Sequence, residues 1–178
     1  MTHSRARTTG AVYLFYFLVA IFAESLVGRV PGTFSDTANL IANAVYVVVS
    51  LLLYQMLEPV NRNVALLAVV ISIIGCIVQS LSLFHLTSPQ GALPIFGCFN
   101  LAIGYLIFRS TFLPHVLGVL MALSGLAWLT VLSPELLKHI VVYVEIIGVA
   151  AEASLMLWLL VMGVNVQRWN EQAGTTER

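Results

Sequence analysis

Long uninterrupted runs of apolar residues, separated by short polar or Pro- and Gly-containing segments, occupy most of the chain. A helix needs about 20 mainly apolar residues to cross a bilayer. The pattern predicts six transmembrane helices, at about residues 10–27, 36–57, 64–84, 92–108, 116–132 and 138–165. The dyad alternation of an outer-membrane barrel is missing from these runs. We therefore expect an all-α fold, a six-helix transmembrane bundle that forms one integral membrane domain over residues 1–178.

The first and fourth runs need separate interpretation. A basic start followed by an apolar run is also typical of a signal peptide, but no convincing small-x-small cleavage site precedes Glu24, which favours a first span. The fourth run is only about 17 residues long and contains Pro94. Its length and its proline predict a tilted or broken segment that begins inside the membrane boundary. The tail after Trp169 is polar and short, and we expect it to be frayed.

Composition excludes several classes of protein. Apolar residues make up 60% of the 178-residue chain and charged residues only 9%, against about a quarter in soluble domains. The mean hydropathy is +0.96. The formal net charge is zero, so no nucleic-acid partner is indicated, and the expected partner is the lipid bilayer. Cys76 and Cys98 both fall inside apolar runs, where they are interpreted as small core residues.

The distribution of basic residues predicts the orientation. Six spans place both termini on one side, and six of the eight basic residues fall on that side: Arg5, Arg7, Arg62, Arg109, Arg168 and Arg178. Only Arg29 and Lys138 fall on the other side. Because cytoplasmic loops carry an excess of Lys and Arg, we expect both termini to be cytoplasmic.

Two glutamates interrupt the last apolar run. Glu145 and Glu152 are seven residues apart, so on a helix they share a face and lie about 10 Å apart along the axis. Gly148 falls between them and leaves room for another helix. Glu152 lies near the middle of the membrane, and no Lys or Arg is expected at that depth. We therefore expect Glu152 to be protonated or to hold a cation, and we favour a functional role for it over a structural one.

Seven polar residues fall in the outer halves of the predicted helices or at mid-membrane. They are Glu24, Asn39, Asn43, Gln79, Asn100, Glu145 and Glu152. One interpretation is an acidic pocket that opens outward and ends near Glu152. The other is that the amides only form hydrogen bonds between helices, which we prefer for the four Asn and Gln residues. Glu24 stays open, because it could reach the membrane surface or pair with Arg29.

The remaining candidate chemistry is sparse. His85 and His139 are expected at the outer boundary, where they could approach Glu145 or Glu24, but no metal-ligand spacing such as HExxH supports a metal site. The chain has no GxSxG elbow, no Walker loop and no CxxC. Catalytic residues and cofactors are therefore not assigned.

Three stretches carry a resemblance to a known family. The matching residues are Tyr54, Pro59, Val60 and Asn61 in the first, Arg109, Ser110 and Pro114 in the second, and Glu152, Leu157, Trp158, Leu159 and Leu160 in the third. The chain resembles a bacterial family of small multi-pass membrane proteins catalogued as domain of unknown function 4386. Glu58, His115 and Met162 depart from basic residues of that pattern. The resemblance implies a six-helix protein of the bacterial inner membrane, brings no activity, and adds weight to Glu152.

Three functional hypotheses follow. The leading one is binding or transport of a small solute or ion, such as a cation, in an outward-facing acidic pocket formed by the seven polar residues. The second is a membrane-embedded enzyme or metal site that uses Glu145 and Glu152 with His85 or His139. The third is a structural or regulatory subunit that docks through the glycine face of the fourth helix. The oligomeric state is not predicted.

Overall fold

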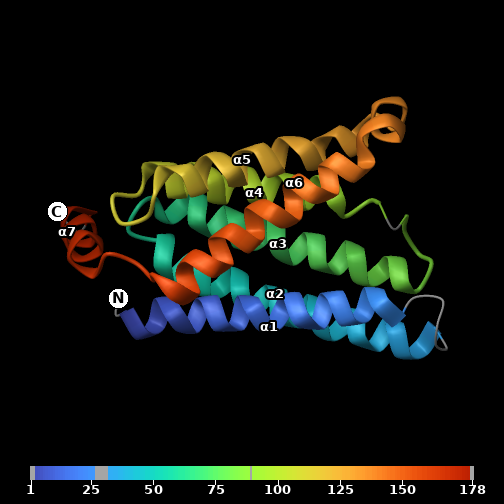
Figure 1. Cartoon of the computed structure of the whole chain (residues 1–178), viewed down its shortest axis with the longest axis horizontal. Coiled ribbons are helices and arrows are strands. Elements are labelled where there is room, and N and C mark those ends of the chain that lie inside the picture. Colours follow the sequence, from blue (N-terminus) through green and yellow to red (C-terminus); the bar gives the residue numbers. More distant parts are fainter. Residues whose placement is uncertain (1–2, 27–31, 89, 177–178) are drawn as a thin grey trace.

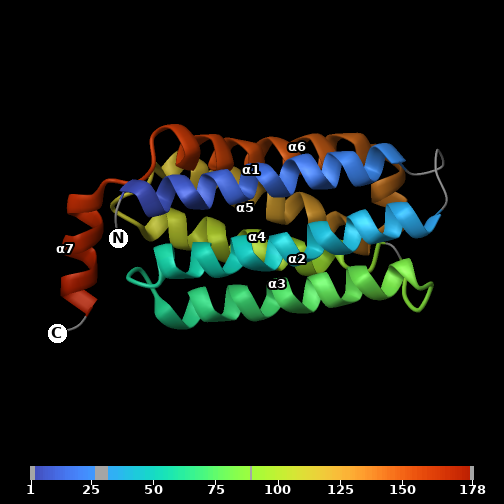
Figure 2. The same cartoon turned by 90° about the horizontal axis from the view of Figure 1, so that it is seen from below.

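The computed structural model describes residues 3–26, 32–88 and 90–176, and in this part of the chain all regular structure is helical. The elements are α1 (His3–Leu26), α2 (Gly32–Leu57), α3 (Arg62–Leu83), α4 (Leu93–Arg109), α5 (His115–Leu129), the 3₁₀ helix η1 (Thr130–Leu132), α6 (Pro134–Val161) and α7 (Val166–Thr176). Helices α1 to α6 run up and down along one direction, and α7 lies across the end of the bundle where α1 begins (Figures 1 and 2). We call this end the terminal end and the opposite one the distal end.

Large apolar side chains cover the outside of the bundle. Phe15, Leu18 and Ile21 of α1 are 53%, 58% and 62% exposed, and α3 exposes Leu66 and Leu67 in the same way. Water would penalise such a surface, whereas lipid would not. Five of the helices, α1, α2, α3, α5 with η1, and α6, are long and apolar enough to cross a membrane. The apolar helix α4 is shorter, with 17 residues.

Helix α4 is continuous from Leu93 to Arg109, because Pro94 lies in its first turn, where a proline has no helical hydrogen bond to remove. The helix is about 26 Å long, somewhat less than the thickness of the hydrocarbon core of a bilayer. Of the two predicted alternatives, a tilted or a broken segment, the break is therefore not present. The tilt of α4 in a membrane stays a prediction.

Helix α6 ends earlier than the sequence suggested. The pattern extended the last span to residue 165, but the helix ends at Val161, and Gly163 follows in the left-handed conformation with φ of +70°. The backbone N–H groups of Met162 and Gly163 both donate to the carbonyl of Trp158, at 2.8 and 3.0 Å. A glycine in this conformation is a common helix stop. The change in direction was hidden in the sequence because the residues around Gly163 are apolar.

The tail that we expected to be frayed is part of α7. The side-chain oxygen of Asn165 accepts a hydrogen bond from the backbone N–H of Arg168 at 3.1 Å, which caps the first turn of this helix. The indole N–H of Trp169 donates to the carbonyl of Met56 at the end of α2, at 2.8 Å. Gln172 accepts hydrogen bonds from Thr111. Residues 171–176 of the expected frayed tail are therefore helical, and residues 177–178 lie outside the described residues.

Glycines bring α4 and α5 into backbone contact at two levels. A Cβ atom on Gly104 would lie 2.8 Å from the carbonyl oxygen of Gly118, and one on Gly97 would lie 2.9 Å from that of Gly125. Small residues are the usual means of close helix packing in membranes. The glycine face of α4 is thus covered by α5 of the same chain. It is not available to dock another subunit, which removes the surface on which the structural-subunit hypothesis depended.

Candidate functional site

Glu152 is the centre of a hydrogen-bonded group that joins four helices. The phenol O–H of Tyr13 on α1 donates to Glu152 Oε2 at 2.9 Å. The side-chain amide of Asn100 on α4 donates to Glu152 Oε1 at 3.3 Å and to Ser124 Oγ on α5 at 3.0 Å. Tyr13, Asn100 and Ser124 are fully or almost fully buried, and Glu152 is half-buried. We call these four residues the Glu152 cluster.

The four residues occupy one level of the bundle. Tyr13 and Asn100 lie near the middle of α1 and α4, whereas Ser124 and Glu152 lie about two thirds of the way along α5 and α6. The hydrogen bonds between them place the four side chains at the same height. In a membrane this level would be the centre of the bilayer, where an isolated charge is most costly.

Basic residues lie far from this level. In the described part of the chain, arginines occupy the first two turns of α1 (Arg5, Arg7), the start of α3 (Arg62), the end of α4 (Arg109) and α7 (Arg168). Arg29 and Arg178, which entered the charge count, lie outside the described residues. The Glu152 carboxylate accepts hydrogen bonds from two neutral groups, the phenol of Tyr13 and the amide of Asn100. The negative charge of an ionised Glu152 is therefore not balanced by an arginine.

One hydrogen-bond acceptor of the cluster has no protein partner. The carbonyl oxygen Oδ1 of Asn100 is buried and accepts no hydrogen bond within the described residues, although both donated bonds of its amide are made. Buried acceptors normally find a partner. The cluster therefore contains more oxygen acceptors than donors, which is an environment that accommodates a proton or a cation.

Aromatic rings surround the Tyr13 side of the cluster. Tyr13 contacts Phe17 and Tyr46 with ring centroids 5.6 and 6.4 Å apart, and Tyr16 contacts Tyr46 at 4.7 Å. Tyr46 also contacts Phe99 of α4 at 5.7 Å. Phenols and ring faces offer a cation further favourable contacts.

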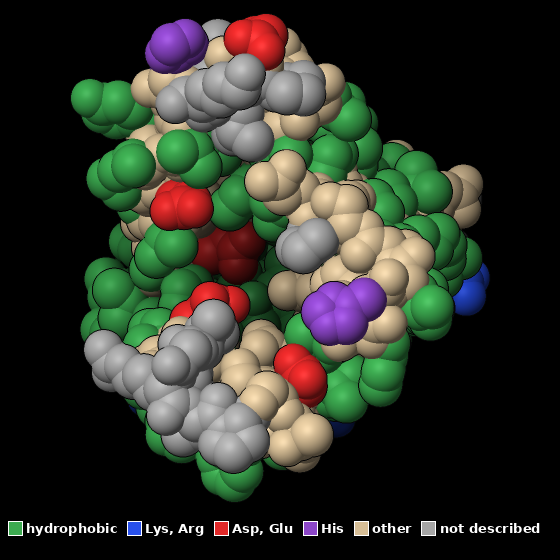
Figure 3. All heavy atoms as spheres, turned by 90° about the vertical axis from the view of Figure 1, so that its right-hand side faces the viewer, with side chains coloured by type: hydrophobic (Ala, Val, Ile, Leu, Met, Phe, Trp, Pro, Cys, Tyr) green, Lys and Arg blue, Asp and Glu red, His purple; other side chains and the backbone are tan. Residues whose placement is uncertain are grey.

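A hollow opens at the distal end of the bundle (Figure 3). Helix α6 crosses the bundle obliquely (Figure 1). At the terminal end α6 meets α1, where a Cβ atom on Gly10 would lie only 2.5 Å from the backbone nitrogen of Leu160. Toward the distal end α6 instead packs on α5, where Gly148 lies against the indole of Trp128. Figure 3 shows the hollow from the distal end, with acidic side chains around it and one acidic side chain deep inside it. The space expected at Gly148 is thus filled by a tryptophan side chain.

The structure brings two of the seven polar residues from the sequence pattern into contact, Asn100 and Glu152. Glu24 and Glu145 are exposed on α1 and α6. Asn39 donates to the carbonyl of Ser35 in its own helix, at 3.1 Å. Asn43 donates to Ser80 Oγ of α3, at 3.0 Å, in a contact between helices. Gln79 is half-buried near the distal end of α3.

Sequence reasoning missed Tyr13 and Ser124, because each falls inside an apolar run and neither is charged. A polar residue at the middle of a span was the signal that could have found both, but Tyr and Ser are common enough in such runs to make this signal weak. Within the described ranges no group of three or more His, Cys, Asp or Glu side chains is placed to hold a metal. His85 and His139 are exposed.

The fold and the cluster define a class of protein, an all-helical integral membrane protein with several apolar helices and a polar group at mid-bundle. A family model described as a domain of unknown function (DUF4386) matches residues 32–92 and 90–163. The chain therefore belongs to this family, and the resemblance seen in its sequence is confirmed. No curated protein and no solved structure matches the chain.

Proposed function

We propose that this protein binds or transports a small solute or ion in an outward-facing intramembrane pocket, and that Glu152 is the group that holds the ligand. The observation that carries the proposal is the Glu152 carboxylate inside the bundle, with hydrogen bonds from the neutral side chains of Tyr13 and Asn100. A carboxylate in this position needs a proton or a cation. The ligand is therefore a cation or a solute with a cationic group.

The free acceptor Asn100 Oδ1 and the acidic residues at the distal end support a cationic ligand. Glu24 and Glu145 are exposed, and Glu24 lies in the last turn of α1, at the distal end. Acidic groups at the mouth of a cleft raise the local concentration of cations. In this proposal they attract the ligand, whereas the Glu152 cluster binds it.

The topology that this function requires is six spans in a bacterial inner membrane, with α4 as the fourth span and both termini in the cytoplasm. The excess of arginines at the terminal end supports it. Single cysteines at Thr33 and Ser88, in a protein with Cys76 and Cys98 replaced by alanine, are expected to react with an impermeant maleimide added outside intact cells. A cysteine at Asn63 is expected to react only after the membrane is opened. The reverse pattern would place the hollow on the cytoplasmic side and contradict an outward-facing pocket.

The direct test of the function is Glu152→Gln, with Glu145→Gln as the matched control on the same helix. Purified protein in lipid nanodiscs is titrated with monovalent, divalent and small organic cations, while thermal unfolding is followed. We expect at least one cation to stabilise the wild type and to have no effect on Glu152→Gln. Glu145→Gln should still be stabilised, at a somewhat higher cation concentration, because Glu145 attracts the ligand but does not bind it. The amide copies the shape of a protonated acid, so the variant should be at least as stable as the wild type without ligand.

Infrared spectroscopy of the carboxyl band tests the same proposal without a known ligand. The spectrum of the wild type minus that of Glu152→Gln should contain the band of a protonated carboxylic acid at pH 7, and a bound cation should remove this band. An ionised Glu152 at pH 7 with no cation present would contradict the proposal. Failure of Glu152→Gln to fold would also contradict it, since the residue would then be structural.

A further inference from the structure

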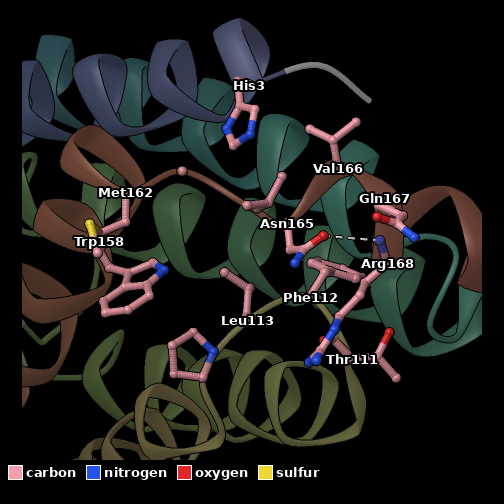
Figure 4. Close-up of a pocket in the computed structure, with 13 residues that line it drawn as sticks. His3, Thr111, Phe112, Leu113, Trp158, Met162, Asn165, Val166, Gln167 and Arg168 are labelled. Carbon is pink, nitrogen blue, oxygen red and sulfur yellow. Dashed lines mark hydrogen bonds between the residues drawn. The ribbon is translucent and has the colours of Figure 1, made fainter.

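A second cavity lies at the terminal end, remote from the Glu152 cluster. It has a volume of about 620 Å³ and lies between the start of α1, the α4–α5 loop, the end of α6 and the first turn of α7 (Figure 4). Its polar lining includes His3, Thr111, Asn165, Gln167 and Arg168. Most of its other lining residues are apolar, among them Trp158, Phe112 and Leu113. The cavity therefore combines a polar side with an apolar floor.

The walls of this cavity are fixed by specific contacts. Gly163 turns the chain away from α6, and the backbone N–H of Asn165 donates to the carbonyl of Phe112 at 3.3 Å. The backbone N–H and the hydroxyl of Thr111 both donate to Gln172 Oε1 of α7, each at 3.1 Å. The α4–α5 loop and α7 are thus held together, and the cavity between them is a built feature of the fold.

The polar lining favours an anion. Arg168 supplies a guanidinium group, of which one nitrogen donates to the carbonyl of Thr111 at 3.3 Å and leaves other N–H groups for a ligand. His3 and Gln167 also line the cavity, and Figure 4 shows the Arg168 side chain extending toward Thr111. Arg7 is close by, since its guanidinium donates to the carbonyl of Val161 at 3.3 Å. The described lining residues include no Asp or Glu.

From this combination we infer that the terminal-end cavity binds the phosphate group of an anionic phospholipid, with Arg168 as the main phosphate contact. Arginine matches a phosphate with two parallel hydrogen bonds. The cavity lies where the membrane-length helices α1 and α6 begin and end, which is the level of lipid headgroups. The apolar floor can take the upper part of an acyl chain, which a soluble phosphate ion does not have. Basic pockets between transmembrane helices commonly bind such lipids.

The test compares lipid binding to the purified protein by native mass spectrometry from detergent, with phosphatidylglycerol and phosphatidylcholine as the two probes. We expect the wild type to retain phosphatidylglycerol preferentially, and Arg168→Gln to lower that preference about fivefold, the effect of losing one arginine contact. Arg62→Gln is the matched control, since Arg62 lies at the same end but pairs with Glu58, at 3.3 Å, outside the cavity. Equal losses in the two variants would show a general charge effect and overturn the site.

Two further arms separate the alternatives. Glycerol 1-phosphate and inorganic phosphate are offered as competitors, and we expect neither to displace the lipid; displacement at equal concentration would show a site for soluble phosphates and overturn the lipid assignment.

The emission of Trp169, measured against the protein with Trp169→Phe, reports whether α7 stays docked on Met56. Arg168→Lys keeps the charge and is expected to restore most of the preference. The contrary outcome has two parts. In Arg168→Gln the lipid preference is lost only when α7 also undocks, and in Arg168→Lys the docking returns but the lipid preference does not. Arg168 would then be structural, and the proposal would fail.

Discussion

The α4–α5 pair and the α1–α6 pair both pack through glycines, but they differ in the number of close backbone contacts. Helices α4 and α5 approach through glycines at two levels, Gly97 with Gly125 and Gly104 with Gly118. Helices α1 and α6 have one such approach, at Gly10, near the terminal end. One close contact fixes a crossing point, whereas two fix a parallel alignment. The first pair is therefore closed along its length, and the second pair opens toward the distal end.

The position of Glu152 follows from this difference. Tyr13 lies less than one turn beyond Gly10 on α1, and Glu152 lies about two turns before Leu160 on α6, so their contact comes directly after the crossing point. At the crossing the backbones touch and leave no room for a polar group. Farther out the helices separate, and Glu24 and Glu145 are exposed. The divergence thus places one carboxylate at the base of a hollow.

The largest loss of stability is expected from a substitution that forces α4 and α5 apart. In Gly104→Leu the new Cβ would lie 2.7 Å from the backbone nitrogen of Ala122, and backbone atoms cannot move aside as a side chain does. We expect a loss of about 3 kcal/mol in the free energy of unfolding, measured by denaturant titration in detergent. Gly174→Ala is the control, because nothing lies within 4 Å of that position. Equal stability of Gly104→Leu and the wild type would show that this interface is not closely packed.

A smaller effect is expected at the single close approach of α1 and α6. In Gly10→Leu the new side chain would meet the backbone of Leu160, but α1 can tilt away because its other hydrogen-bonded contacts with α6 are made by the side chains of Arg7 and Tyr13. We expect a loss of about 2 kcal/mol. We also expect the variant to lose the cation response assigned to Glu152, since Tyr13 moves away from the carboxylate. A folded variant that keeps the full response would show that the crossing point does not set the geometry of the Glu152 cluster.

The smallest effect is expected from Tyr13→Phe, which removes one hydrogen bond and keeps the ring. We expect it to cost about 1 kcal/mol in the free energy of unfolding. The affinity for the cation should change as well, because the carboxylate loses a donor that holds it in place. Tyr105→Phe, on the exposed side of α4, is the matched control and should change neither quantity. An identical response of the two variants would remove Tyr13 from the Glu152 cluster.

The sequence by itself determined the class of protein and the depth of its main polar groups. Hydropathy and run length are local properties, and a helix follows from them whatever its neighbours are. The same local reading placed Asn100 and Glu152 at mid-helix, where the structure finds them in contact. The sequence left open whether the fourth span is tilted or broken, because the effect of Pro94 depends on its position within the helix, and in α4 it lies in the first turn.

Tertiary structure decided which side chains meet. Tyr13 and Glu152 are 139 residues apart, and their contact depends on the crossing point of two helices. That crossing is set by the backbone approach at Gly10. A glycine in an apolar run does not indicate which other helix it will contact. The same holds for α7, whose docking needs the left-handed Gly163 together with the contact of Trp169 on Met56. Depth along a helix is encoded residue by residue, but rotation and crossing of helices are properties of pairs, and a single sequence does not contain them.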